Sequence, residues 1–177
     1  MSLTDRELWA AIHGLILGGI FLLSFTGGLV GLYSLKERFL TAEGVAERTP
    51  RLLIGGIVLA VVAWLTVITG TYIVYPWYRA VPPEGTTDLT AYPKSLLLAD
   101  PNTANWHNFA MEWKEHIAWM APFLATSVAI VILYYGIQLI RRREMRVPLL
   151  GAFTLAFGAA AVAGIFGAFI TKAAPIY

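Results

Sequence analysis

Four long apolar runs with almost no charge in them dominate this chain of 177 residues. A helix needs about 20 consecutive apolar residues to cross the hydrocarbon core of a membrane, and each run is long enough. We expect an all-α polytopic membrane protein that forms one membrane domain over residues 1–177. Its architecture would be an antiparallel bundle of four transmembrane helices, at about 8–35, 52–75, 106–140 and 148–170.

The distribution of basic residues predicts how these helices are oriented. Eight lie in the two connections between paired helices: Lys36, Arg38, Arg48, Arg51, Arg141, Arg142, Arg143 and Arg146. The opposite side carries five: Arg6, Arg79, Lys94, Lys114 and Lys172. Basic loops stay in the cytoplasm. Both termini and the 76–105 loop are therefore expected on the outer side of a bacterial-type cytoplasmic membrane.

Prolines and turn residues indicate where the helices are interrupted. Pro76 is expected to end the second helix, because proline cannot extend a helix cleanly. Pro122 frees the carbonyl of Ala118 in the third helix, so a bend is expected there. The loop at 76–105 is rich in proline and turn residues, with one short interfacial segment expected at SLLLA, residues 95–99.

Composition excludes several classes of function. The chain has no cysteine, which excludes disulfides, thiolate metal sites and covalently attached haem. A net charge of +2 gives no reason to expect nucleic acid as a partner. The inner halves of the four runs lack the ionisable residues that mark a transport pathway, which argues against a channel or transporter.

The three histidines are the strongest candidates for a site, because an ionisable residue inside a membrane helix is costly. At about 1.5 Å per residue, His13 and His116 lie roughly 33 and 36 Å from the inner ends of their helices, and so at similar depth. His107 lies roughly 50 Å up by the same measure and is expected at the surface. His107 and His116 are nine residues apart, which places them on opposite faces of a regular helix.

Two neutral imidazoles at one depth are suited to bind one haem iron from its two faces. His13 and His116 are the expected axial ligands of a haem b, and Glu112 shares a helix face with His116 and would orient it. Tyr72 is the aromatic residue expected to line the haem, and Arg79 is expected to pair with a propionate. Trp113, Trp119, Lys114 and Glu115 are expected to belong to the interfacial belt.

With His13 in IHGL and His116 in EHIAW, the chain resembles the small four-helix membrane cytochromes b, which include haem-bearing anchors of respiratory enzymes. The resemblance implies electron transfer between quinone and a partner subunit, with lipid and the other subunits of a larger complex as partners. A single histidine pair allows one haem near the outer face.

Two other interpretations remain open from the sequence. The chain is suited by its small size to be a haem-free structural or assembly subunit of a respiratory or photosynthetic membrane complex. His116 and Glu112, with or without His107, could instead form a non-haem metal or quinone site.

Overall fold

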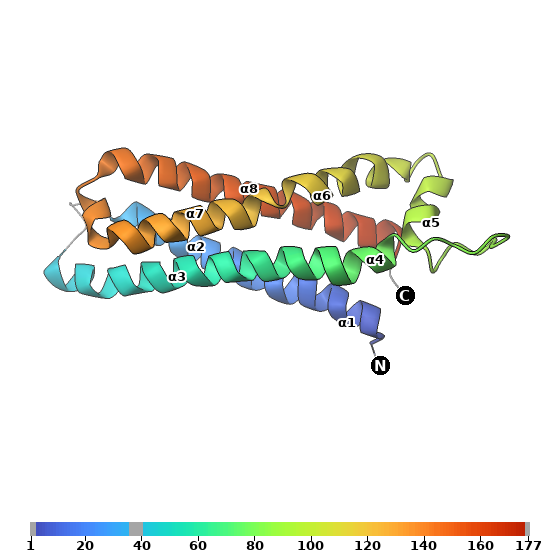
Figure 1. Cartoon of the computed structure of the whole chain (residues 1–177), viewed down its shortest axis with the longest axis horizontal. Coiled ribbons are helices and arrows are strands. Elements are labelled where there is room, and N and C mark those ends of the chain that lie inside the picture. The colour runs from blue at the N-terminus through green and yellow to red at the C-terminus, as the bar shows by residue number, and fades with distance from the viewer. Residues whose placement is uncertain (1–2, 36–40, 176–177) are drawn as a thin grey trace. The chain divides into compact units, whose positions relative to one another are not determined.

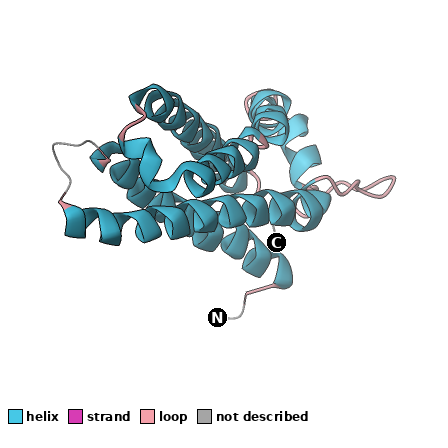
Figure 2. Ribbon diagram, turned by 60° about the vertical axis from the view of Figure 1, so that its left-hand side comes forward, coloured by secondary structure: helices cyan, strands magenta, loops and turns pink. Residues whose placement is uncertain are grey.

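The computed structural model describes residues 3–35 and 41–175, and all regular structure in these ranges is helical (Figure 2). Four helical stretches are long and apolar enough to cross a membrane: Asp5–Ser34, Ala42–Tyr78, Trp106–Ile140 and Arg143–Ala173. Each has 30 residues or more, against the roughly 20 that a bilayer core requires. The expectation of an all-helical chain with four helices able to span a membrane is confirmed, and the fold is consistent with a helical bundle. Lys36 and Arg38 of the first basic connection lie outside the described residues.

The first span consists of α1 (Asp5–Ala11), a π-helical segment η1 (Ile12–Leu17) and α2 (Gly18–Ser34). Thr4 caps it, because its hydroxyl accepts from the backbone N–H of Glu7 at 3.3 Å and the Glu7 carboxylate accepts from the backbone N–H of Thr4 at 2.8 Å. This reciprocal capping satisfies backbone donors at the helix start. The helix therefore begins slightly before the expected residue 8.

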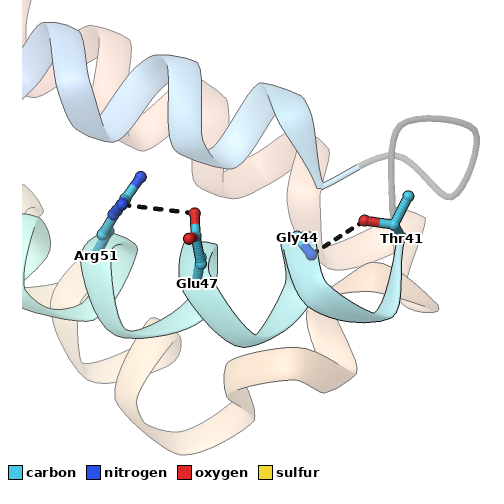
Figure 3. A network of polar contacts seen from close by, with 4 residues as sticks. All are labelled: Thr41, Gly44, Glu47 and Arg51. Carbon is cyan, nitrogen blue, oxygen red and sulfur yellow. Dashed lines mark hydrogen bonds and ion pairs between the residues drawn. The ribbon is translucent and has the colours of Figure 1, made fainter.

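The second span joins α3 (Ala42–Thr69), a π-helical segment η3 (Gly70–Val74) and α4 (Tyr75–Tyr78). Figure 3 shows its first turns, where the Thr41 hydroxyl accepts from the Gly44 N–H at 3.1 Å and Arg51 pairs with Glu47 at 3.5 Å. The expectation that Pro76 ends this helix is wrong. Pro76 lies in the first turn of α4, where the missing N–H of proline leaves no bond unmade.

The second half of the chain holds α5 (Pro93–Ala99), η4 (Trp106–Met111, a π-helix), α6 (Glu112–Ile117), α7 (Met120–Tyr135), the 3₁₀ segment η5 (Gly136–Ile140) and α8 (Arg143–Ala173) (Figure 1). The short segment expected at 95–99 lies in the helix α5. The α-helix is interrupted by a turn at residues 118–119, immediately before α7. This agrees with the bend expected from Pro122, which cannot bond to the carbonyl of Ala118.

The loop between α4 and α5 projects away from the neighbouring helices in both ribbon views (Figures 1 and 2). Within it, one carboxylate oxygen of Asp88 accepts from the backbone N–H of Thr90 at 3.0 Å and from its hydroxyl at 2.7 Å. Both bonds favour the charged carboxylate and lower the pKa of Asp88. A local Asx turn of this kind orders a loop without help from a packed core.

The chain divides into two compact units, each built from three segments. Unit 2 comprises 19–64 and 120–159, and unit 1 comprises 1–18, 65–119 and 160–177. In unit 2, Phe25 of α2 stacks on Phe153 and Phe157 of α8, with ring centroids 4.8 and 4.1 Å apart. Trp64 donates to the Thr126 hydroxyl at 2.9 Å, which joins α3 to α7. Aromatic packing and hydrogen bonds such as these, together with those from Arg48 to the Ser34 carbonyl and from Arg146 to the Leu35 carbonyl, therefore join the helices of unit 2.

Unit 1 has an apolar cluster of its own, made by α4, α5, η4 and the last turns of α8. Its buried members are Tyr78, Leu97, Ala110, Met111, Ile170 and Ala174. Aromatic rings extend this cluster, since Trp106 stacks on Phe169 at 5.3 Å and Trp113 meets Phe166 edge-on at 5.6 Å. Here the packing surrounds polar groups as well as apolar ones.

Candidate functional site: a polar interior in unit 1

Three π-helical segments occur in the part of the chain that the structure describes, and all three lie in unit 1. One contains His13, one begins at Gly70, and one contains His107. A π-turn is rare inside an α-helix and is frequently found at functional sites. Unit 1 also contains all three histidines, so this is where a site is to be sought.

His13 is half-buried and its ring packs between the first and second spans. Its Nδ1 lies 3.3 Å from the Thr69 hydroxyl oxygen, and that hydroxyl already donates to the carbonyl of Leu65 at 2.7 Å. A hydroxyl has one proton, so the His13 Nδ1–H is the donor in the first bond. With the proton on Nδ1, the Nε2 of a neutral His13 ring carries the lone pair.

Gly70 leaves the space that the His13 ring occupies. A Cβ at residue 70 would lie 2.6 Å from Cε1 of the ring and 3.2 Å from each of its nitrogens. No side chain larger than hydrogen fits at residue 70 unless the ring moves. The position of His13 therefore depends on the second span as much as on its own helix.

His116 lies on an exposed face of α6. Its Nδ1 donates to the backbone carbonyl of Glu112 at 2.7 Å, and a carbonyl can only accept, which assigns the proton to Nδ1. The Nε2 of His116 thus also keeps its lone pair. The group of Glu112 that bonds the His116 ring is its backbone carbonyl, and no bond to the Glu112 carboxylate, the group expected to orient this ring, is seen in the described residues.

His107 is not a surface residue, and that expectation is wrong. It is 5% exposed, and it is the one buried polar or charged side chain among the described residues. Its Nδ1 is hydrogen-bonded to the Tyr78 hydroxyl at 3.0 Å, and the Tyr78 side chain is itself buried. Helical phase did place His107 and His116 on different faces, but His107 is the one that faces inward.

Glu115 also faces inward, although it was expected in the interfacial belt. Its Oε1 is buried and has no hydrogen-bond partner among the described residues. Its carboxylate lies beside the Tyr75 hydroxyl, which accepts from Arg79 Nη1 at 2.8 Å. A buried carboxylate oxygen without a partner is unusual in a folded protein and calls for an explanation in terms of a ligand, a water or a proton.

Two of the expected cofactor contacts are placed elsewhere by the structure. Tyr72 is 70% exposed, so it does not line the interior, where Tyr78 is buried and Tyr75 is half-buried. Arg79 lies over the Tyr75 ring at 5.3 Å as well as bonding its hydroxyl. Arg79 therefore already has a partner, and its guanidinium is held against Tyr75.

Lys114, which was likewise expected in the belt, is folded onto α8. Its Nζ would lie 2.9 Å from a Cβ at Gly167, so the amine occupies the space that this glycine leaves. Neighbouring residues of α6 thus divide between three surroundings: Lys114 faces α8, Glu115 faces α4, and His116 is exposed.

Within the described ranges, no three side chains among His, Cys, Asp and Glu come close enough to hold a metal ion on their own. Comparison with family models, with curated proteins and with solved structures finds no match to this chain.

Sequence reasoning missed Tyr78, Glu115 and Lys114 because it used ideal helical phase and a fixed belt. The π-turn at 106–111 changes which face each following residue presents, and nothing in WHNFAM signals it. The repetition of Tyr75 and Tyr78 around Pro76 was the available signal for the tyrosine pair, since their spacing of three puts both on one helix face.

Proposed function

We propose that this protein is an electron-transfer subunit of the membrane that binds one haem b, with His13 and His116 as its axial ligands. The observation that carries the proposal is the hydrogen bonding of the two rings. Each donates from Nδ1 to an oxygen of the protein, and each leaves Nε2 unprotonated.

This state is what iron requires of an imidazole. Histidines that bind metals usually donate their other ring N–H to a carbonyl or another oxygen, which fixes the tautomer and raises the basicity of the ligating nitrogen. Thr69 does this for His13 and the Glu112 carbonyl does it for His116. Bound haem would supply one-electron redox chemistry, and the axial ligands would set its potential.

The proposal includes the orientation derived from the basic residues, with both termini and unit 1 on the outer side of a cytoplasmic membrane. Electron exchange would then take place in the outer half of the membrane, with quinone or a redox subunit as the partner. Lipid surrounds the exposed apolar side chains, of which Leu15, Leu23 and Tyr134 are each more than 75% exposed.

The exposure of His116 favours one second candidate, a haem-free accessory subunit of a larger membrane complex. In that case His116 Nε2 would bond to a neighbouring subunit, and the polar interior of unit 1 would have a structural role. The two candidates differ in whether the purified protein absorbs light as a b-type cytochrome.

The experiment is an absorption spectrum of the purified protein, oxidised and after dithionite reduction, from cells supplied with haem. We expect a reduced α-band that is lost in His13→Ala and in His116→Ala and retained in His107→Ala. His107→Ala is the matched control, because it removes the third histidine of the chain from the same unit.

A further inference from the structure

Two arginines of unit 2 differ from the other basic residues at the same end of the candidate spans. The described residues of the two basic connections, 41–51 and 141–148, contain six arginines and three glutamates. Arg48 and Arg146 are half-buried, whereas the other four arginines are exposed, namely Arg51, Arg141, Arg142 and Arg143. A half-buried arginine needs partners that an arginine in water does not, so this pair is examined for a ligand.

Arg48 and Arg146 reach the same end of α2 from two different helices. Arg48 of α3 donates from Nη1 to the Ser34 carbonyl at 3.4 Å, and Arg146 of α8 donates from Nη1 to the Leu35 carbonyl. Consecutive Cα atoms are about 3.8 Å apart, so both guanidinium groups are held at one helix end. Leu35 and Leu139 are 2% and 0% exposed, which shows that this end of unit 2 is well packed.

The two carbonyls satisfy part of the hydrogen bonding of this pair but do not balance its charge. The C-terminal end of a helix is equivalent to about half a negative charge, against two positive charges on the guanidinium groups. Neither group has a carboxylate within 4.0 Å among the described residues. Glu47, which precedes Arg48, is paired with Arg51 instead (Figure 3). Two like charges held at one helix end repel each other unless an anion binds to both.

The surroundings of the pair favour a phosphate that carries acyl chains. A guanidinium has five N–H donors in a planar fork that matches phosphate, and only one donor of each group is used by a carbonyl. Exposed apolar side chains continue from both arginines along the candidate spans: Val30 lies one turn before Ser34, and Val147 follows Arg146. Basic clusters directly beside a membrane span commonly bind anionic lipid head groups.

We propose that Arg48 and Arg146 bind the phosphate of one anionic phospholipid at this end of unit 2. The phosphate would accept from the free N–H groups of both arginines and so balance their charge. It would thereby join the ends of α2, α3 and α8, with the acyl chains against the exposed valines. The site goes beyond the proposed function, because it belongs to unit 2 and does not require a haem at the histidines.

The test is native mass spectrometry of the purified protein from micelles with equal amounts of phosphatidylglycerol and phosphatidylcholine. We expect the wild type to retain one phosphatidylglycerol in preference to phosphatidylcholine. Arg48→Gln combined with Arg146→Gln should lower this preference by roughly tenfold or more, because hydrogen bonds to a charged group are lost. The matched control, Arg51→Gln combined with Arg141→Gln, removes the same charge from two exposed arginines and should keep the preference. An equal loss in both double variants would overturn the proposal, because it would indicate general attraction to a basic surface.

A lysine variant tests the site if the glutamine variant does not fold. Arg48→Lys combined with Arg146→Lys keeps both charges but lacks the planar fork of donors. We expect this variant to retain phosphatidylglycerol more weakly than the wild type does. Retention equal to that of the wild type would count against the site.

Thermal unfolding of the wild type in phosphatidylcholine micelles distinguishes a lipid from a soluble ion. We expect added phosphatidylglycerol to raise the melting temperature, and the same concentration of inorganic phosphate to have little effect. Equal stabilisation by inorganic phosphate would overturn the lipid as the ligand, and no stabilisation by either would overturn the site. Loss of haem binding would change none of these results, so the two proposals fail separately.

Discussion

Gly28 in unit 2 and Gly70 in unit 1 each leave space for an aromatic ring from another helix. A Cβ at Gly28 would lie 2.5 Å from Cζ of Phe153, and a Cβ at Gly70 would lie 2.6 Å from Cε1 of His13. In both units a glycine lets an aromatic ring from another helix approach the backbone, as small residues commonly do between membrane helices.

The difference lies in what surrounds each ring. Phe153 stacks on Phe25 in a wholly apolar contact, whereas His13 is hydrogen-bonded to Thr69. Unit 1 has the same contact between a glycine and an aromatic ring, and it also contains π-helical turns and buried polar groups. The contact in unit 2 is explained by apolar packing, whereas unit 1 contains buried polar groups, which are costly inside a membrane helix and are therefore candidates for a function.

The largest effect is expected from alanine at these two glycines. Forcing a methyl group into either contact should cost roughly 2 kcal/mol, which is typical of an overpacked core. Gly14→Ala in unit 1 and Gly55→Ala in unit 2 are the matched controls, because a Cβ at either meets no atom within 4 Å. Thermal unfolding in detergent, followed by circular dichroism, measures the difference.

The same variants also distinguish the two units by their effect on binding. Gly70→Ala should change binding at His13 as well as stability, whereas Gly28→Ala should change stability alone. Equal stability of Gly70→Ala and Gly14→Ala would show that the His13 ring does not lie against Gly70.

A smaller effect is expected from Tyr78→Phe. The hydroxyl of Tyr78 is the hydrogen-bond partner of the buried His107, and its removal leaves a buried ring nitrogen unpaired at a cost of about 1 kcal/mol. Tyr72→Phe removes the same atom from a side chain that is 70% exposed and should leave the melting temperature unchanged. Identical melting temperatures for the two variants would show that the Tyr78–His107 hydrogen bond does not stabilise unit 1.

The smallest effect is expected at the surface of unit 2, where Glu47 and Arg51 pair at 3.5 Å with both side chains well exposed (Figure 3). An exposed pair four residues apart in a helix contributes about 0.3–0.5 kcal/mol and is screened by salt. Glu47→Gln should therefore lower stability by no more than this, and the difference should vanish at 1 M salt, where the Debye length is about 3 Å. A loss above about 1 kcal/mol would indicate that this turn is coupled to the core.

The helices were predictable from the sequence because apolar runs of this length have few alternatives to crossing a membrane. The bend before α7 was predictable for a similar reason, since Pro122 removes a specific backbone donor. The ends of the spans were less so: Ala42 lies ten residues before the expected start of the second span, because the polar turns at its N-terminus carry no hydropathy signal.

The site was predicted only in part. The three histidines were identified, and His107 was correctly separated from His116, but the burial of the two was reversed. The face that a residue presents depends on the π-turns and on which helix packs against it, and neither can be read from the residues themselves. Glu115 and Lys114 were misplaced for the same reason, because charged residues beside two tryptophans usually mark a belt.

The most direct test of the central claim is the reduced-minus-oxidised absorption spectrum of the purified protein and its histidine variants. We predict a b-type α-band in the wild type and in His107→Ala, and no band in His13→Ala or His116→Ala. A wild type that remains without a Soret band after haem supplementation, or a band that survives the loss of His13 or His116, would contradict it.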